Sequence, residues 1–326
     1  MLISFCLLNR TALPQIRVKE YLSRLKKRGK LSELNDDNAL KGQHLMGSVT
    51  TKKHENGLDY VDVNTPLCKA RIFLQGAQID YFEPVGQKPL LWVSSADDYQ
   101  PGNGIRGGIP VCWPWFGMSD NPDFPQHGFA RTRIWSLESV KMHDQVVDLK
   151  FSLNISEEDK QYWPHDTEVA VLMTLSDTLS VSLVNTNHSD YEVSLTQALH
   201  TYFPIEDIHQ LKATGFSGAK YIEFGEGPFP QQQDDVDFTK ETDRVYTELA
   251  EVQQLHTPNG IIEVKREHSS SAVLWNPWID KSTRLSRFNS DDYLTMVCLE
   301  AANVLEDNVV LAPNESHTLT THIRWK

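Results

Sequence analysis

The sequence lacks the patterns that mark several large classes of protein. None of its four cysteines lies in a CxxC pair, so the sequence predicts neither a disulfide framework nor a zinc site, and it fits a reducing compartment. No apolar run approaches the roughly 18 residues of a membrane-spanning helix. Residues 1–8 are apolar, but Asn9 and Arg10 follow them, and no basic segment precedes them as a secretory signal would require. We therefore expect a cytoplasmic protein.

The motifs of nucleotide and hydrolase chemistry are missing as well. The chain has no GxGxxG, P-loop, HExxH, GxSxG or EF-hand pattern. Dinucleotide binding, ATP hydrolysis, zinc proteolysis and serine-hydrolase chemistry are therefore not the first hypotheses. The net charge of −13 argues against sequence-independent binding of nucleic acids. We expect neither a nucleic acid nor a membrane as a partner.

Basic charge is concentrated at the start of the chain. Residues 1–30 hold eight Lys or Arg against one Glu, a net charge of +7, so the rest of the chain carries −20 of the total of −13. Such a segment can be a targeting arm, a patch for nucleic acids or membranes, or translated sequence ahead of the true start. We favour the last, because Met46 stands just before the first strand-like segment. We expect residues 1–45 to form a poorly packed basic extension and residues 46–326 to form one domain.

The sequence after residue 58 is typical of a β protein. Short runs rich in Val, Ile, Leu, Phe and Thr alternate with Gly, Asn, Asp and Pro. Strands are predicted at 69–74, 78–83, 146–154, 169–175, 179–186, 193–202, 261–265, 271–275, 294–300 and 317–324. Helix is sparse, and its one good start signal is a capping-box pattern at Ser156. Many short strands with few short helices predict an all-β fold, a large sandwich or barrel.

The segment 105–133 combines rigid, aromatic and charged residues. Two glycines allow positive φ or a close approach of the backbone to a ligand, prolines stiffen the chain, and Trp and Phe provide flat surfaces. This frame carries Arg106, Gln126, His127 and Arg131. Two guanidiniums, an amide and an imidazole beside aromatic rings suit an anionic, hydroxyl-rich ring as ligand. The alternative is a tight turn with core aromatics and solvated arginines.

Two further positions suggest acid–base chemistry. His200 lies in the predicted strand 193–202, where period two places it beside small Ala198 on one face. Glu300 closes the apolar strand 294–300, so we expect it to be partly buried with a raised pKa. The two could form an acid–base pair, or be a hydrogen-bonded core histidine and a solvent-facing glutamate. Asp243 could be a solvated loop residue, and Trp275 could be a sugar-stacking platform or a sandwich corner.

Six segments together resemble a known family. They are Arg106–Gly117, Pro125–Arg131, Leu199–Phe203, Thr242–Tyr246, Val273–Trp278 and Cys298–Glu300. In this order they are similar to motifs of the glucose-6-phosphate 1-epimerases, or hexose-6-phosphate mutarotases, which are relatives of aldose 1-epimerase. The resemblance runs from about Asp59 to the C-terminus. It implies a large antiparallel β-supersandwich of the galactose-mutarotase type, without a metal or an organic cofactor.

The resemblance also implies roles for individual residues. His200 matches the catalytic histidine and Glu300 the catalytic glutamate. The positions that match substrate-binding residues are Arg106, Gln126, Arg131 and Asp243, with His127 and Trp275 in support. The implied reaction is anomer interconversion of a hexose 6-phosphate, with Glu300 as the base and His200 as the acid. We expect a sugar phosphate as the partner and a monomer as the oligomeric state.

Two other kinds of protein remain open at this point. A sugar-phosphate-binding or sensing protein on the same fold would keep the arginines and aromatic residues, but it would not need both His200 and Glu300. A glycoside hydrolase or lyase would normally use two carboxylates that flank the scissile bond. The motifs supply one carboxylate and one histidine, which favours the epimerase.

Overall fold

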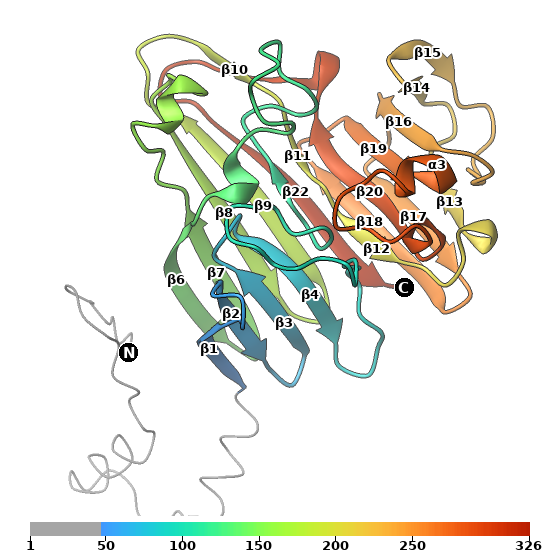
Figure 1. Ribbon diagram of the computed structural model, residues 1–326, viewed down its shortest axis with the longest axis horizontal. Coiled ribbons are helices and arrows are strands. Elements are labelled where there is room, and N and C mark those ends of the chain that lie inside the picture. Colours follow the sequence, from blue (N-terminus) through green and yellow to red (C-terminus); the bar gives the residue numbers. More distant parts are fainter. Residues whose placement is uncertain (1–46) are drawn as a thin grey trace, which may run out of the picture. The chain divides into compact units, whose positions relative to one another are not determined.

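Alternating burial along the strands organises the fold. In the computed structural model, which describes residues 47–326, strand β9 (Leu179–Asn187) alternates between buried and half-buried residues. Side chains on one face of the strand therefore enter the core, while side chains on the opposite face stay partly exposed to solvent. The same alternation recurs in other strands of the large antiparallel sheets (Figure 1). The expected extension of residues 1–45 lies outside the described residues.

Two eight-stranded sheets dominate the structure. The supporting sheet has the order β13-β17-β18-β22-β9-β8-β7-β6. Besides β9, its strands are β6 (Ser136–His143), β7 (Val146–Ser152), β8 (Thr167–Leu175), β13 (Lys212–Thr214), β17 (Val252–Thr257), β18 (Gly260–Glu267) and β22 (Ser316–Trp325). The site sheet has the order β15-β14-β16-β19-β20-β11-β5, and β12 also pairs with β20. Its strands are β5 (Val111–Cys112), β11 (Gln197–Leu199), β12 (Tyr202–Pro204), β14 (Lys220–Glu223), β15 (Glu226–Pro230), β16 (Thr242–Thr247), β19 (Ser271–Asn276) and β20 (Met296–Asn303).

Smaller elements complete the fold. A four-stranded sheet contains β1 (Ser48–Lys53), β2 (Asp59–Asn64), β3 (Cys68–Phe73) and β4 (Gln78–Pro84), and a two-stranded sheet contains β10 (Val193–Leu195) and β21 (Val309–Leu311). The described residues form one short α-helix, α3 (Trp278–Ser282). The 3₁₀ turns are Ala130–Thr132, Asp159–Gln161, Ile208–Gln210, Asp292–Leu294 and Leu305–Asp307. The expectation of an all-β antiparallel sandwich with few short helices is confirmed.

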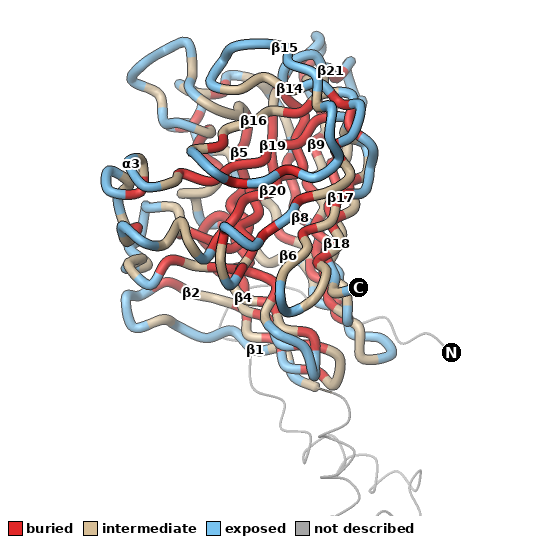
Figure 2. Tube along the Cα trace, turned by 90° about the vertical axis from the view of Figure 1, so that its right-hand side faces the viewer, coloured by how far each residue is buried: buried red, intermediate tan, exposed pale blue. Residues whose placement is uncertain are grey.

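Strand β20 is buried on both faces, at the centre of the site sheet (Figure 2). Its odd-numbered residues, such as Leu299, join the main hydrophobic core, which also contains residues of the supporting sheet. Its even-numbered residues, such as Cys298, join a second cluster on the opposite face. The site sheet therefore packs one face against the main core and turns the other toward the polar residues described below.

Two local expectations were wrong in their details, and a third is confirmed. The predicted strand 193–202 is three short strands, because Thr196 and His200 leave the ladder and donate their N–H groups to Pro114 and Pro110. The capping box at Ser156 forms as expected, with mutual hydrogen bonds to Asp159, and it opens a 3₁₀ turn before Pro164. Glu300 is inside β20 and not at its end, because the strand continues to Asn303.

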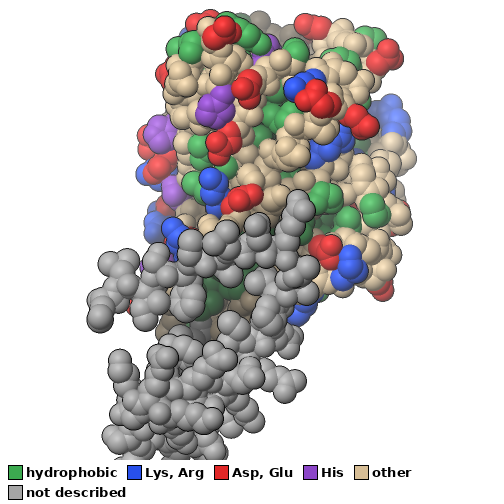
Figure 3. Space-filling view, turned by 90° about the vertical axis from the view of Figure 1, so that its left-hand side faces the viewer, with side chains coloured by type: hydrophobic (Ala, Val, Ile, Leu, Met, Phe, Trp, Pro, Cys, Tyr) green, Lys and Arg blue, Asp and Glu red, His purple; other side chains and the backbone are tan. Residues whose placement is uncertain are grey.

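Charges of both signs are interspersed over the described part of the surface that is visible in Figure 3. No helix in residues 47–326 is long and apolar enough to cross a membrane.

Candidate active site

A cavity of about 320 Å³ lies on the outer face of the site sheet. The period of two along the strands explains its polar floor. Glu300 on β20 and Trp275 on β19 share the face of Cys298, and Asp243 extends from β16 beside them. His200 stands where the chain passes from β11 to β12, next to β20. The segment between β5 and β6 forms the opposite wall.

His200 and Glu300 form a buried pair in this cavity. The distance from His200 Nε2 to Glu300 Oε1 is 3.3 Å, and their side chains are 10% and 1% exposed. The Tyr202 ring stacks on the imidazole with a centroid distance of 4.9 Å and an interplanar angle of 9°, which fixes the plane of the imidazole. Nδ1 of His200 and Oε2 of Glu300 are buried without a hydrogen-bond partner among the described residues. Both groups can therefore still bond to a ligand.

Burial moves the pKa values of this pair in opposite directions. It raises the pKa of Glu300 well above the usual value of a glutamate; Asp243 adds to the rise and Arg131 opposes it. It lowers the pKa of His200 well below the usual value of a histidine, and the positive charges of Arg131 and Arg106 add to this effect. Both groups are therefore driven toward their neutral forms. With one titratable proton between them, the His200–Glu300 pair has no net charge, whether the proton is on the carboxyl or on the imidazole.

Arg106 and Arg131 line the cavity, and neither forms an ion pair with a carboxylate of the described residues. Arg131, on the 3₁₀ turn Ala130–Thr132, donates to the carbonyl oxygen of Gln126 at 2.7 Å. Arg106 Nε is buried without a hydrogen-bond partner. Uncompensated guanidiniums in a partly buried cavity favour an anionic ligand.

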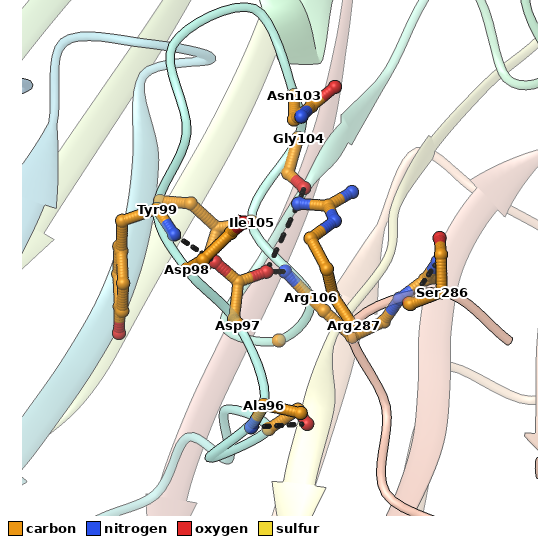
Figure 4. A network of polar contacts seen from close by, with 12 residues as sticks. Ala96, Asp97, Asp98, Tyr99, Asn103, Gly104, Ile105, Arg106, Ser286 and Arg287 are labelled. Atoms are coloured by element: carbon orange, nitrogen blue, oxygen red, sulfur yellow. Dashed lines mark hydrogen bonds and ion pairs between the residues drawn. The ribbon is translucent and has the colours of Figure 1, made fainter. Parts of the chain in front are cut away.

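A polar network fixes the position of Arg106 (Figure 4). The buried carboxylate of Asp97 accepts the backbone N–H of Arg106 at 2.7 Å and pairs with Arg287 at 3.2 Å. Arg287 also donates to the carbonyl oxygen of Gly104 at 2.7 Å. Gly108 follows with φ 62°, where an added Cβ would collide with the Ile79 carbonyl oxygen. The prediction that the glycines of this segment allow positive φ is confirmed, since Gly107 has φ 143° as well.

His127 enters the cavity as a neutral hydrogen-bond donor. Its Nδ1 accepts the N–H of Gly117 at 3.1 Å, so the remaining proton is on Nε2. Burial, together with the positive charges of Arg131 and Arg106, lowers the pKa of His127 to about 3. The ring lies edge-on to His200 with a centroid distance of 5.7 Å. His127 therefore suits the binding of a ligand oxygen.

The remaining wall contains a residue that the sequence did not suggest. Lys281 on α3 lies 3.0 Å from Glu241 and 3.4 Å from Asp243, and its ammonium is 5.8 Å from the centre of the Trp275 ring. Asn276 holds α3 in place, because its side chain accepts the Trp278 N–H at 2.9 Å. A lysine in a short helix after proline gives no distinctive signal in the sequence.

All eight predicted site residues line this one cavity: Arg106, Gln126, His127, Arg131, His200, Asp243, Trp275 and Glu300. Lys281, Met118, Tyr202 and Leu285 also line the cavity and were not predicted as site residues, whereas Phe116 belongs to the aromatic frame expected in segment 105–133. His200, Cys298 and Glu300 form a group within the described residues that could hold a metal ion, with ligand atoms within 4.8 Å of one another. Burial raises the pKa of the Cys298 thiol, so that a metal would have to displace its proton.

Comparison with known proteins agrees with this geometry. The family model described as aldose 1-epimerase matches residues 59–324. The chain belongs to the aldose 1-epimerase family. Its relatives include a protein of Escherichia coli named "Putative glucose-6-phosphate 1-epimerase", which is 34% identical over 82% of this chain and 91% of its own length.

Solved structures of the family share the fold. The crystal structure of a "putative mutarotase" from Salmonella typhimurium matches with a TM-score of 0.79 and 28% identity, over 92% of this chain and 98% of that one. A galactose mutarotase related enzyme from Lactobacillus acidophilus matches with a TM-score of 0.63 at 15% identity, over 86% of this chain and 97% of that one. The second likeness supports the fold alone. Family membership places this epimerase among enzymes of sugar metabolism.

Proposed function

We propose that this epimerase interconverts the α and β anomers of hexose 6-phosphates, with glucose 6-phosphate as the first candidate. The observation that carries the proposal is the buried pair His200–Glu300, 3.3 Å apart, in a cavity that also holds two arginines without carboxylate partners in the described residues. The pair suits proton transfer, and the arginines suit a phosphate. The name of the Escherichia coli relative refers to the same substrate.

The reaction needs two proton transfers in ring opening, their reversal in ring closure, and no other reagent. The carboxylate of Glu300 takes the proton of the anomeric hydroxyl while the bond between C1 and the ring oxygen breaks. The imidazolium of His200 protonates that ring oxygen, which leaves an open-chain aldehyde. After rotation about C1–C2, the new hydroxyl attacks the other face of C1 and returns its proton to His200. Glu300 then returns its proton to the carbonyl oxygen, so that the enzyme is unchanged.

The shifted pKa values are compatible with these roles. Burial favours the form in which Glu300 holds the single proton of the pair. Moving that proton across the 3.3 Å to His200 creates the reactive base and acid without changing the net charge of the cavity. A base with a raised pKa also binds the substrate proton more strongly. The assignment of Glu300 as base and His200 as acid follows the family resemblance.

The arginines supply the preference for a phosphorylated sugar. Each charge-assisted hydrogen bond to a phosphate contributes about 1.5–3 kcal/mol. The local positive charge also offsets the repulsion that an anionic substrate meets from a chain of net charge −13. Trp275, which is 8% exposed, can cover one side of the sugar ring. Asp243 and Gln126 can bond to hydroxyl groups.

Polarimetry of freshly dissolved α-glucose 6-phosphate tests the proposal. Stopped-flow traces with and without the protein, in a buffer free of phosphate, should show that the protein accelerates the change in rotation. Glucose and galactose, measured under the same conditions, should be accelerated much less. Turnover of a free sugar equal to that of glucose 6-phosphate would contradict the phosphate preference. The absence of any acceleration would favour a binding or sensing protein.

A further inference from the structure

Lys281 lines the cavity beside Asp243. Its ammonium lies 3.0 Å from Glu241 and 3.4 Å from Asp243, and all three side chains are about one-third exposed. Lys281 and Asp243 both line the cavity, together with Glu300. Helix α3 is anchored by Asn276, which is fully buried and donates to the carbonyl oxygens of Tyr293 and Met296 at 2.9 Å. The lysine therefore extends from a fixed base.

Asp243 is the link from Lys281 to Glu300. The Asp243 carboxylate acts on Glu300 through space and makes the loss of the Glu300 proton harder. A cation beside Asp243 offsets that negative charge, because the two fields oppose each other at Glu300. The titratable and charged groups around Glu300 are His200, Asp243, Arg131, Cys298, Cys112 and Tyr202. Among these, Asp243 is the one that Lys281 holds directly.

We propose that Lys281 is a positioning residue that holds Asp243 toward the substrate and offsets its charge beside the catalytic pair. This inference rests on the proposed function and adds a residue to it. In this role Lys281 acts on the reacting end of the sugar, through Asp243, and not on the phosphate. Loss of the ammonium should therefore affect phosphorylated and free sugars alike. A direct phosphate ligand would affect the phosphorylated sugar alone.

The test is the pH profile of kcat/KM for Lys281→Met, with glucose 6-phosphate and with glucose. Without the Lys281 ammonium, the negative charge of Asp243 makes the protons of His200 and Glu300 harder to remove. Both limbs of the profile should therefore move to higher pH, by roughly half a unit or more. On the acid side of the profile, kcat/KM should fall about threefold or more for both sugars. Lys281→Arg keeps the charge and should restore most of the profile.

Two further variants make the test specific. In the double variant Lys281→Met/Asp243→Asn, the pH profile should return toward that of the wild type, whatever the maximum of kcat/KM, because the uncompensated charge in the cavity is gone. Glu241, the other partner of Lys281, keeps its charge but does not line the cavity. Lys240→Met is the matched control, since Lys240 is paired with Glu223 at 3.5 Å and does not line the cavity. Its profile should not move.

The outcomes separate this inference from the proposed function. Wild-type turnover of glucose 6-phosphate is measured first, and its absence would contradict the proposed function itself. Normal wild-type turnover with an unmoved profile in a folded Lys281→Met variant would overturn the role of Lys281 alone. A loss confined to glucose 6-phosphate would also overturn it, because Lys281 would then act on the phosphate. A shift that persists in the double variant would show that Asp243 is not the link.

Discussion

Replacing Glu300 with glutamine should lower activity and raise stability at the same time. Glutamine keeps the shape and the neutral charge of the protonated acid, but it cannot accept a proton. Because a general acid or base contributes roughly 10²–10⁴ in rate, we expect Glu300→Gln to lose at least about a hundredfold in anomerisation rate. That factor corresponds to about 2.7 kcal/mol of transition-state stabilisation. Glu300 is 1% exposed, so no solvent group can replace it.

The gain in stability follows from the raised pKa of Glu300. Below the ordinary pKa of about 4.5 the carboxyl is protonated in both the folded and the unfolded chain, and it imposes no penalty. As the pH rises, the unfolded chain releases the proton first, so the wild type loses stability until the pH passes the folded-state pKa. Each unit by which the pKa is raised costs about 1.4 kcal/mol. Glutamine avoids this cost.

The assay combines exchange kinetics with thermal unfolding at two pH values. Wild type and Glu300→Gln should melt alike near pH 4, and the variant should melt higher near pH 8, by roughly 2 °C for each kcal/mol gained. Near-normal turnover with an unchanged circular dichroism spectrum would refute the role of Glu300 as the base. A variant that melts lower than the wild type near pH 8 would show that Glu300 is ionised in a stabilising contact, which would refute the pKa argument.

Three other predictions concern Arg131, Asp97 and residues 1–40. Arg131→Lys should weaken binding of glucose 6-phosphate, and Arg131→Ala should weaken it more, while the turnover of glucose should change little. Added salt should lower kcat/KM more for the phosphorylated sugar than for glucose. Equal losses in kcat/KM for both sugars would contradict this prediction. Asp97→Asn should raise KM for glucose 6-phosphate several-fold at nearly constant kcat, because Asp97 holds the backbone of Arg106. The control Asp80→Asn, which breaks an equally buried ion pair with Arg71, should lower stability without that change in KM. Removing residues 1–40 should leave activity and melting temperature nearly unchanged, because the family match begins at residue 59, and a loss of several degrees would contradict it.

Local patterns in the sequence were sufficient to predict the class of fold and the chemical types in the site. The predicted strand 179–186 appears as β9 close to its predicted bounds, because its burial alternates with period two. The glycine-backed arginine and the polar residues within apolar strands also stand out locally. Their convergence in one cavity depends on the sheet order, and it was expected from the family resemblance rather than from spacing.

The errors arose where distant contacts decide the local structure. Strand β20 continues past Glu300 because Asn303 is held by Gln197 and by the carbonyl oxygen of His268, which no local pattern shows. Helix α3 exists because Asn276 is fixed by residues about 20 positions away in the chain. The side chain of Asn276 accepts the Trp278 N–H at the start of the helix that carries Lys281. The Trp-Asn-Pro-Trp segment alone suggests only a turn.

The central claim is that the pair His200–Glu300 catalyses anomer exchange, and exchange NMR tests it most directly. The anomeric protons of α- and β-glucose 6-phosphate are observed at equilibrium, and their exchange rate is measured as protein is added. We expect this rate to rise in proportion to the wild-type concentration, and to stay near the spontaneous rate with equal amounts of folded Glu300→Gln or His200→Ala. An exchange rate that wild type leaves unchanged, or that both variants raise as much as wild type does, would contradict it.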